Sequence, residues 1–221
     1  MHKETVIAID GPVASGKTVV GRLLAQKLRP KFLDTGVMYR ALTWAALQRG
    51  VSLDDLETLA RLAGEVSIEL VLAPGEEQVW VDNQDVTDAL RGPDVERAVS
   101  LVAQALGVRE ALVAKQRALA QGGAIVMVGR DIGTVVLPQA TIKVFLQASI
   151  SERSRRRFKE LQSQGKKVAY QEVEWEMERR DRLDTERVYS PLRSAPDALQ
   201  VDTSEVPVEE VARQIIALVK D

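Results

Sequence analysis

Apolar and polar residues follow one another along this chain in a repeating strand-then-helix pattern. Residues 5–10 form a short apolar run typical of a buried strand, and residues 19–29 then repeat apolar positions at helical spacing. The continuous apolar run of residues 124–128 predicts a central parallel strand that is buried on both faces. Residues 141–147 and 199–202 predict two further strands. The pattern therefore predicts an α/β fold, with a central parallel sheet flanked by helices.

Other segments with apolar residues at helical spacing predict further helices, at residues 38–50, 54–63, 95–104, 108–121, 171–187 and 208–219. The stretch of about residues 63–100 breaks the strand-then-helix pattern. Within it, residues 65–72 and 78–81 predict two short strands, joined as a hairpin around Pro74-Gly75. We therefore expect an insertion with a small β structure at this point of the chain.

Length and charge narrow the class of protein. At 221 residues the chain is long enough for one α/β domain with an insertion, but short for two independent domains. The net charge of −2 argues against general binding to nucleic acid or membrane surfaces. Cysteine is absent, no apolar run reaches the roughly eighteen residues of a membrane span, and no signal peptide precedes the first strand. We expect a soluble, cytoplasmic monomer without a nucleic-acid or membrane partner.

The clearest chemical motif lies between the first strand and the first helix. Residues 11–18 (GPVASGKT) fit the spacing G-x-x-x-x-G-K-[ST] of a phosphate-binding loop without a mismatch. Its glycines let backbone N–H groups turn towards an anion, and the helix N-terminus adds a positive partial charge. Lys17 would reach the β and γ phosphates of ATP, and the Thr18 hydroxyl would bind the accompanying Mg²⁺. The alternative, a turn that only starts a helix, is disfavoured by this strand-to-helix context. The predicted ATP-binding residues of this loop are Gly11, Pro12, Val13, Ala14, Ser15, Gly16, Lys17, Thr18 and Val19.

Charged residues after two other predicted strands are candidates for binding a second ligand. Asp34 and Thr35 follow one strand, and both are also plausible N-caps of the next helix. Arg40 lies in the first turns of that helix, where the helix dipole favours anions and gives a cation no advantage. We therefore interpret Arg40 as a ligand-binding residue; a solvated arginine is the alternative. Arg130 and Asp131 follow the buried central strand, at the edge where α/β sheets bind ligands. An ion pair between these two side chains is the alternative.

The segment of residues 149–187 is dense in charge. Residues 149–152 (SISE) carry a capping signature for an arginine-rich helix, and a polar, glycine-containing break follows it. In the next predicted helix, Arg180, Asp184 and Arg187 fall at i, i+4 and i+7, so they share one face. That face could present two guanidinium groups to one anion, although a solvated, salt-bridged face is the alternative. We interpret this segment as a mobile lid.

Together these motifs resemble the bacterial cytidylate kinases over essentially the whole chain. The resemblance rests on the phosphate-binding loop, Asp34-Thr35-Gly36 with Tyr39-Arg40, residues 129–136 (GRDIGTVV), and Arg180-Asp181 with Asp184 and Arg187. The hairpin-containing insertion also resembles the enlarged acceptor domain of that bacterial branch. The resemblance implies a P-loop nucleoside monophosphate kinase with three parts. These are a core of about residues 1–35, 104–148 and 188–221, an acceptor-binding region of about 36–103, and a lid of about 149–187.

The same resemblance implies a reaction in pyrimidine nucleotide metabolism. The γ-phosphoryl group of ATP, with its Mg²⁺, passes to CMP or dCMP and gives ADP with CDP or dCDP. Such a transfer needs positioning and charge neutralisation more than covalent chemistry, which suits lysine and arginine. The implied CMP-binding residues are Asp34, Thr35, Arg40, Ser100, Arg109, Arg130, Asp131, Arg180, Asp184 and Arg187. The implied catalytic residues are Lys17, Arg130, Arg180 and Arg187, and those that pack over the adenine or phosphates of ATP are Arg153 and Arg157.

Within the implied CMP site, three arginines hold the phosphate: Arg40, Arg130 and Arg187. Asp131 accepts a hydrogen bond from the exocyclic amino group of cytosine, which uracil lacks. Ser100 and Arg109 bind the cytosine edge together with Asp131. Without the resemblance, we would interpret them as a helix cap and a solvated surface residue. The residues that touch the sugar or the transferring group are Arg180 and Asp184.

One position departs from the pattern of the family. The residue before Gly129, usually acidic in these kinases, is Val128 here. Any contact of that acid with Mg²⁺ is therefore lost or supplied otherwise, for example by Asp34 or by a water held by the phosphates. Lys17, Thr18 and the arginines are all present, so we still expect an active enzyme.

Two other functions fit part of the pattern. A P-loop kinase for another small acceptor, such as a different nucleotide or shikimate, would share the loop but would not require the base-reading residues Ser100, Arg109 and Asp131. A nucleotide-dependent switch of the small-GTPase kind would need an Asn-Lys-x-Asp motif. The sole asparagine, Asn83, is followed by Gln84, so the switch is disfavoured.

Overall fold

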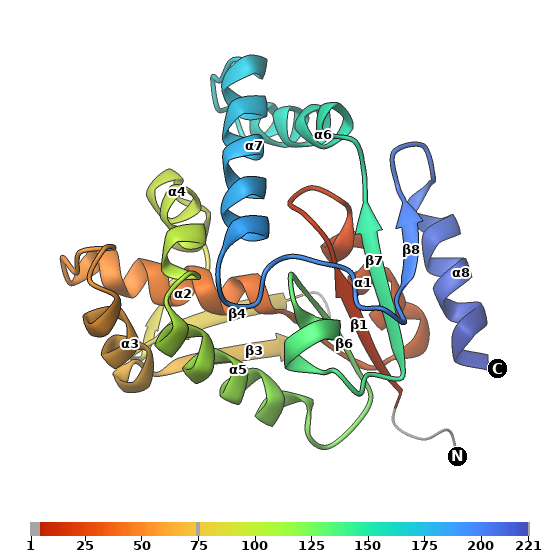
Figure 1. Ribbon diagram of the computed structural model, residues 1–221, viewed down its shortest axis with the longest axis horizontal. Coiled ribbons are helices and arrows are strands. Elements are labelled where there is room, and N and C mark those ends of the chain that lie inside the picture. The colour runs from red at the N-terminus through yellow and green to blue at the C-terminus, as the bar shows by residue number, and fades with distance from the viewer. Residues whose placement is uncertain (1–4, 74–75, 221) are drawn as a thin grey trace. The chain divides into compact units, whose positions relative to one another are not determined.

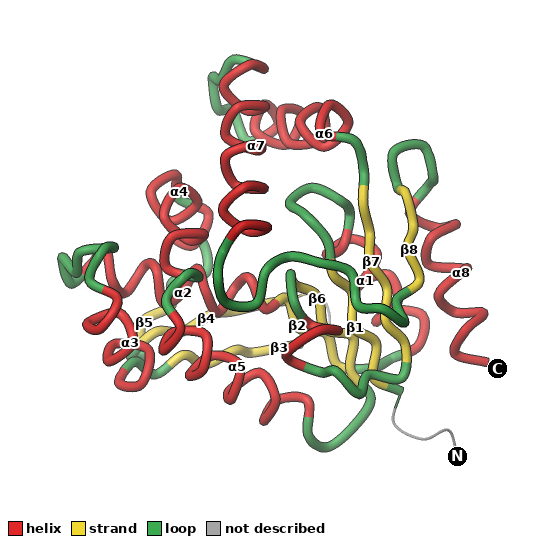
Figure 2. The backbone as a smooth tube through the Cα atoms, viewed as in Figure 1, coloured by secondary structure: helices red, strands yellow, loops and turns green. Residues whose placement is uncertain are grey.

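The computed structural model describes residues 5–73 and 76–220, and these fall into two compact units. The first unit comprises the described residues up to Pro30 and from Ala124 onwards, and the second comprises those between Lys31 and Gly123. Figures 1 and 2 show the helices and strands of each unit. Within the described ranges, no helix is long and apolar enough to cross a membrane.

The first unit is built on parallel strands. They are β1 (Val6–Asp10), β6 (Ile125–Gly129), β7 (Ile142–Gln147) and β8 (Leu199–Asp202). The strands lie in the order β6-β1-β7-β8, and β6 is buried along its whole length, as its apolar run predicted. Asp10 pairs with Gly129 at the carboxyl ends of β1 and β6. The segments after these two strands therefore leave the sheet next to each other, at the edge where α/β sheets bind ligands.

Helices follow these strands. They are α1 (Lys17–Leu28), α6 (Ile150–Ser163), α7 (Tyr170–Glu186) and α8 (Val208–Lys220). The helices α1 and α8 pack on each other and on the sheet, whereas α6 and α7 pack on each other (Figure 1). The predicted cap of α6 is confirmed, because the Glu152 amide donates to Ser149 Oγ over 3.2 Å. A single π-helical turn, Ile132–Val136, follows β6, and the sequence did not predict it.

The second unit contains β2 (Lys31–Asp34), α2 (Thr35–Gln48), α3 (Leu56–Glu65), β3 (Ile68–Ala73), β4 (Glu76–Val81), β5 (Gln84–Asp85), a 3₁₀ turn (Ala89–Arg91), α4 (Pro93–Val102) and α5 (Leu106–Ala120). The predicted antiparallel pair is confirmed, with Ile68 of β3 opposite Val81 of β4. Pro74-Gly75, around which the turn was predicted, lies outside the described residues. The helices of this unit bury a core that includes Leu42, Leu59 and Leu112.

The predicted fold class is confirmed. The protein has an α/β fold with a parallel sheet flanked by helices, and it carries a small antiparallel sheet, in the order β3-β4-β5, within the predicted insertion. The element boundaries differ from the predicted ones by a few residues at most. The two-residue strand β5 and the 3₁₀ turn were not predicted, because segments this short leave no periodic pattern.

Candidate active site

The phosphate-binding loop joins β1 to α1 in the conformation that its glycines allow. Gly11 has φ 150°, and a Cβ there would lie 2.0 Å from the carbonyl oxygen of Leu146, so no other residue fits without movement. Gly16 caps α1 with φ 91°. Ala14 is also left-handed, with φ 57°, although it carries a side chain. The predicted strand, loop and helix are thus confirmed as a continuous unit.

Lys17 lies folded over this loop. Its side chain is buried, and Nζ donates to the Pro12 carbonyl at 2.5 Å and to Ser15 Oγ at 3.4 Å. Thr18 follows in the first turn of α1 and is half-buried. The ammonium group is therefore held at the rim of a loop whose amide groups suit an anion.

A second set of charged residues gathers where β6 ends. Arg130 Nε donates to Asp184 Oδ2 over 2.7 Å, and Arg187 Nη2 lies 3.8 Å from Asp131 Oδ1. Burial by itself would raise the pKa of Asp184, but the charges of Arg130, Arg180 and Arg187 outweigh it and lower that pKa. The structure thus brings together the predicted residues of the strand end and of the late helix, within one unit.

The position of Arg187 differs from the prediction. Helix α7 ends at Glu186, and Arg187 is in an extended conformation with φ −60° and ψ 141°. The expected i, i+4, i+7 face therefore does not include Arg187. Instead the chain turns, so that the Arg187 Nε donates to the Ser190 carbonyl at 2.6 Å and the Leu192 amide donates to the Asp184 carbonyl at 2.8 Å. This turn, rather than helical spacing, places Arg187 beside Asp131.

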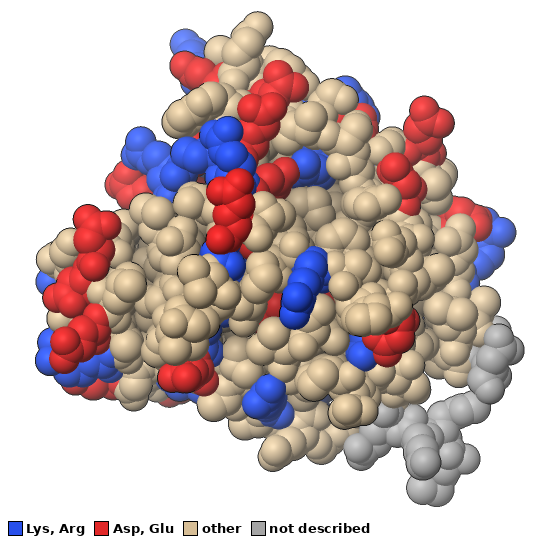
Figure 3. Space-filling model, viewed as in Figure 1, with Lys and Arg blue, Asp and Glu red and all other residues tan. Residues whose placement is uncertain are grey.

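Elsewhere α7 carries ion pairs, as the alternative interpretation of this helix, a solvated and salt-bridged face, predicted. Arg179 and Glu176 pair at 2.6 Å, three residues apart. Figure 3 shows acidic and basic side chains intermingled over the region of α6 and α7. Asp184, by contrast, is 4% exposed. The helix therefore has a salt-bridged outer side together with a buried acid near its end.

Arg153 and Arg157 of α6 were predicted to pack over ATP. Arg153 is buried and forms a two-pronged ion pair with Asp181 of α7 at 2.6 and 3.1 Å. Its Nη1 also lies 3.4 Å from the Val13 carbonyl of the phosphate-binding loop. Arg157 pairs with Glu160 at 2.8 Å. Arg153 thus contacts the loop through a carbonyl.

Asp10 is a buried acid that the sequence analysis did not single out. It is 3% exposed, and its two carboxyl oxygens accept the amides of Ile132 and Gly133, each at 2.7 Å. Burial raises the pKa of Asp10 to about 6, against the lowering effect of the two amide hydrogen bonds. Asp10 thereby ties the end of β1 to the turn after Arg130 and Asp131. Its position as the last residue of a buried strand, directly before Gly11, was the signal that could have identified it.

In the second unit, Asp34 caps α2, because its Oδ1 accepts the Gly36 amide at 3.0 Å. The capping interpretation of Asp34 is therefore confirmed. Thr35 is the first residue of the helix and is buried, so it is not the cap. Arg40 is half-buried, and its guanidinium lies against Gly36, where an added Cβ would be 3.3 Å from Nη1. The arginine side chain thus turns back towards the first turn of α2.

Arg109 and Ser100 are both buried in the second unit, at 3% and 5% exposure. Arg109 Nη1 donates to the Ala103 carbonyl at 3.3 Å, and its guanidinium carbon lies 5.4 Å from the centre of the Tyr39 ring. The alternative of a helix cap and a solvated surface residue is therefore wrong for this pair. Tyr39 fixes the arginine, and neither spacing nor composition could have shown that contact.

Comparisons with known proteins point to one family. The family model described as "Cytidylate kinase" matches residues 7–221. A cytidylate kinase from Geobacillus thermodenitrificans (strain NG80-2) is 50% identical over 221 residues, covering 100% of this chain and 99% of that protein. A cytidylate kinase from Bacillus subtilis (strain 168) is 46% identical over 220 residues, covering 100% and 98%. The crystal structure of an uncharacterized protein from Eubacterium ventriosum ATCC 27560 shares the fold, with a TM-score of 0.54, 13% identity and 99% of each chain covered.

Proposed function

Because the chain belongs to the cytidylate kinase family, we propose that its phosphate-binding loop and the charged cluster after β6 carry phosphoryl transfer from ATP to CMP or dCMP. The products are ADP and CDP or dCDP. The observation that carries this proposal is the pairing of Asp10 with Gly129. It sets the loop after β1 beside Arg130 and Asp131 after β6, so the donor loop and two of the assigned acceptor residues are neighbours within the first unit.

The donor site is residues 11–19. The loop amides and the N-terminus of α1 bind the phosphates of ATP, and Lys17 neutralises charge on the β and γ phosphates. Arg153 and Arg157 are assigned to the ATP side of the lid. Two anionic nucleotides repel each other, so this concentration of positive charge is the main contribution of the chain to the reaction.

Mg²⁺ accompanies ATP in this proposal. Among the described residues, no cluster of three or more acidic or histidine side chains could hold a metal ion by itself. This donor set fits an ion held largely by phosphate oxygens and water, with the Thr18 hydroxyl as the protein ligand. Val128 is buried within β6 and offers no oxygen from its side chain. When bound, Mg²⁺ would neutralise charge on the phosphates.

The acceptor residues are assigned by charge and hydrogen bonding. Arg130 and Arg187, together with Arg40 of the second unit, are assigned to the phosphate of CMP. Arg180 and Asp184 are assigned to the sugar or the transferring group. Asp131, Ser100 and Arg109 are assigned to the cytosine edge, where Asp131 would accept from the exocyclic amino group.

We assign domain roles in the same way. Residues of about 1–35, 104–148 and 188–221 form the core, residues of about 36–103 the acceptor-binding region, and residues of about 149–187 the lid. We assign the working form as a monomer in the cytoplasm. Light scattering of the purified protein tests the monomer directly; a dimeric mass would overturn it.

The test of function is steady-state ADP production from ATP and Mg²⁺ with CMP, dCMP, UMP, AMP or shikimate as the acceptor. We expect rates with CMP and dCMP far above those with the other three. A higher rate with UMP or AMP would reassign the base, and a rate with shikimate alone would place the enzyme among kinases of non-nucleotide acceptors.

A further inference from the structure

The phosphate-binding loop needs hydrogen-bond donors for its carbonyl groups. In the proposed ATP site its amides bind phosphate, so they cannot satisfy these carbonyls, and a buried carbonyl without a donor is costly. Thr203, the residue that follows β8, meets this need: its Oγ1 lies 3.1 Å from the carbonyl oxygen of Ser15. Ser15 is fully buried and Thr203 is 4% exposed. A side chain 188 residues away in sequence therefore supports the middle of the loop.

Arg156 of α6 holds Thr203 from the other side of this hydrogen bond. Its Nη1 lies 3.1 Å from Thr203 Oγ1, and its Nη2 donates to the Thr203 carbonyl. A guanidinium group can only donate and a carbonyl oxygen can only accept, so the threonine oxygen accepts from Arg156 and the hydroxyl donates to a carbonyl. The carbonyls within reach are those of Ser15 at 3.1 Å and Gln147 at 3.2 Å. The single hydroxyl hydrogen is thus directed at these two carbonyls, while Arg156 holds the oxygen in place.

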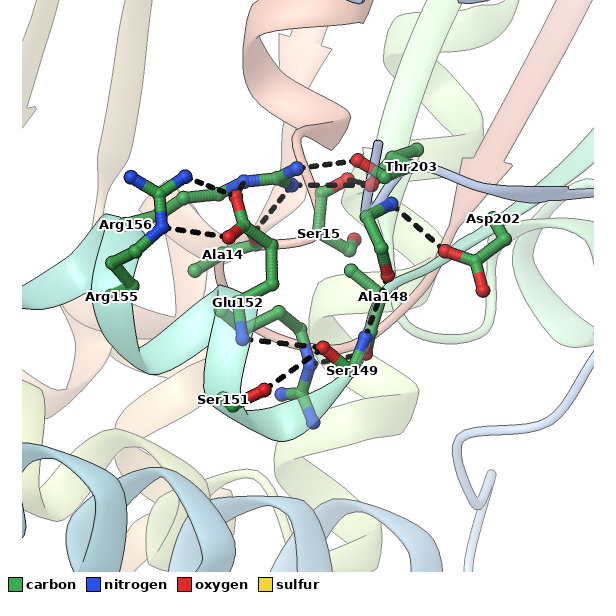
Figure 4. A network of polar contacts seen from close by, with 12 residues as sticks. Ala14, Ser15, Ala148, Ser149, Ser151, Glu152, Arg155, Arg156, Asp202 and Thr203 are labelled. Carbon is green, nitrogen blue, oxygen red and sulfur yellow. Dashed lines mark hydrogen bonds and ion pairs between the residues drawn. The ribbon is translucent and has the colours of Figure 1, made fainter. Parts of the chain in front are cut away.

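Glu152 fixes Arg156 in turn. Its Oε1 accepts from Arg156 Nε at 2.8 Å, and its carboxylate also accepts two hydrogen bonds from Arg155, each at 2.7 Å. The hydrogen bond from Arg155, with a smaller one from Arg156, outweighs burial and lowers the pKa of Glu152 to about 2, so the acid stays ionised at neutral pH. Figure 4 shows the whole chain of contacts, from Glu152 through Arg156 and Thr203 to Ser15.

The loop has reasons to need such support. Ala14 is in the left-handed region, which disfavours any residue with a side chain. Arg156 Nη1 also lies 3.5 Å from the Ala14 carbonyl, a longer contact of the same kind. On its other side, Ser15 Oγ accepts from Lys17 Nζ at 3.4 Å. The position of Ser15 therefore bears on the position of the ammonium group.

We propose that Thr203 and Arg156 are positioning residues for the phosphate-binding loop, with Glu152 orienting Arg156. Together they hold the Ser15 peptide in the orientation that directs the loop amides and Lys17 at the phosphates. The inference rests on the proposed role of this loop as the ATP site. It also means that the first two turns of α6, which the lid assignment includes, are fixed to the donor site.

The test uses a matched set of variants of the full chain. Thr203→Val keeps the shape of the side chain but removes the hydroxyl, and Thr203→Ser keeps the hydroxyl. We expect Thr203→Val and Arg156→Gln to lower kcat/KM for ATP roughly tenfold, with KM for CMP within about twofold of wild type. Thr203→Ser should stay close to wild type. Lys159→Gln is the control, because Lys159 lies on the same helix and its side chain is exposed.

A binding measurement separates this inference from the proposed function. Calorimetric titration with ADP should show about tenfold weaker binding to Thr203→Val than to Thr203→Ser, whichever acceptor the wild type phosphorylates. Equal ADP affinity in those two variants would overturn the inference even if CMP is the substrate. So would equal losses in Arg156→Gln and Lys159→Gln, because a general effect on α6 would then explain them.

Discussion

At the scale of single residues, we expect Lys17 to contribute most to the rate of phosphoryl transfer. It is a buried cation whose Nζ is held by the Pro12 carbonyl of its own loop, so its position is set before ATP arrives. We expect Lys17→Ala to lower kcat by roughly a hundredfold or more, because the loop then has no side-chain charge for the transferring phosphate. Lys27→Ala, an exposed lysine on the same helix, is the control. Wild-type turnover in Lys17→Ala would remove the loop from the chemistry.

Asp131 tests the recognition of the base. It is 4% exposed and lies 3.8 Å from Arg187. Without its carboxylate, the amino group of cytosine loses an acceptor while UMP loses nothing comparable. We expect Asp131→Ala to reduce the ratio of kcat/KM for CMP to that for UMP roughly tenfold. The exposed acid Asp197, in the variant Asp197→Ala, should leave this ratio unchanged. An unaltered ratio in Asp131→Ala would take it out of base recognition.

At the scale of elements, the apolar pattern predicted β1 and β6 because buried strands need continuous apolar residues. The strand β7 has buried residues at alternate positions and β8 buries only Val201, so their patterns were shorter or mixed. The π-helical turn after β6 could not be predicted, since what holds it is the Asp10 carboxylate, 122 residues away in sequence. The face of α7 was also predicted too simply. Periodicity gives a helix its faces but does not give its last residue, and here the chain leaves the helix one residue before Arg187.

The turn after α7 leads to a prediction of its own. Arg187 contacts Asp131 and the Ser190 carbonyl, so it is held in place beside the strand end. We expect Arg187→Ala to lower turnover of CMP roughly ten- to a hundredfold, the loss of one charge-assisted contact of about 1.5 to 3 kcal/mol. Arg193→Ala, an exposed arginine six residues on, is the control. An unchanged rate, with the fold verified by circular dichroism, would make Arg187 a structural residue only.

At the scale of the whole molecule, the candidate site was predicted in part because its motifs are local. Residues 11–18 and 129–134 can each be recognised as a motif from residues that are close together in the sequence. Their supports are different: Asp10, Thr203 and Arg156 act through partners far away in sequence, so only the folded chain reveals them. The sequence therefore predicts the side chains that contact the substrates better than it predicts the residues that hold those side chains in place.

Asp10 links one such support to the stability of the molecule. Its pKa is raised from 3.8 to about 6 in the folded protein, chiefly by burial. Between these values the folded state binds more protons than the unfolded state, so the contribution of Asp10 to the free energy of unfolding is full below about pH 4 and falls as pH rises through about 6. At about 1.4 kcal/mol per pKa unit, the loss is about 3 kcal/mol.

Urea unfolding of wild type and Asp10→Asn across pH 4 to 8 measures this loss, because other titrating groups, such as Glu152, cancel in the difference between the two proteins. The side-chain amide of the Asp10→Asn variant does not titrate, and it offers one acceptor oxygen in place of two for the amides of Ile132 and Gly133. We therefore expect the stability of wild type relative to Asp10→Asn to decrease between pH 4 and pH 7. A flat difference would mean that the Asp10 carboxyl ionises in the folded protein as it does in the unfolded chain, and that its two amide hydrogen bonds offset its burial completely.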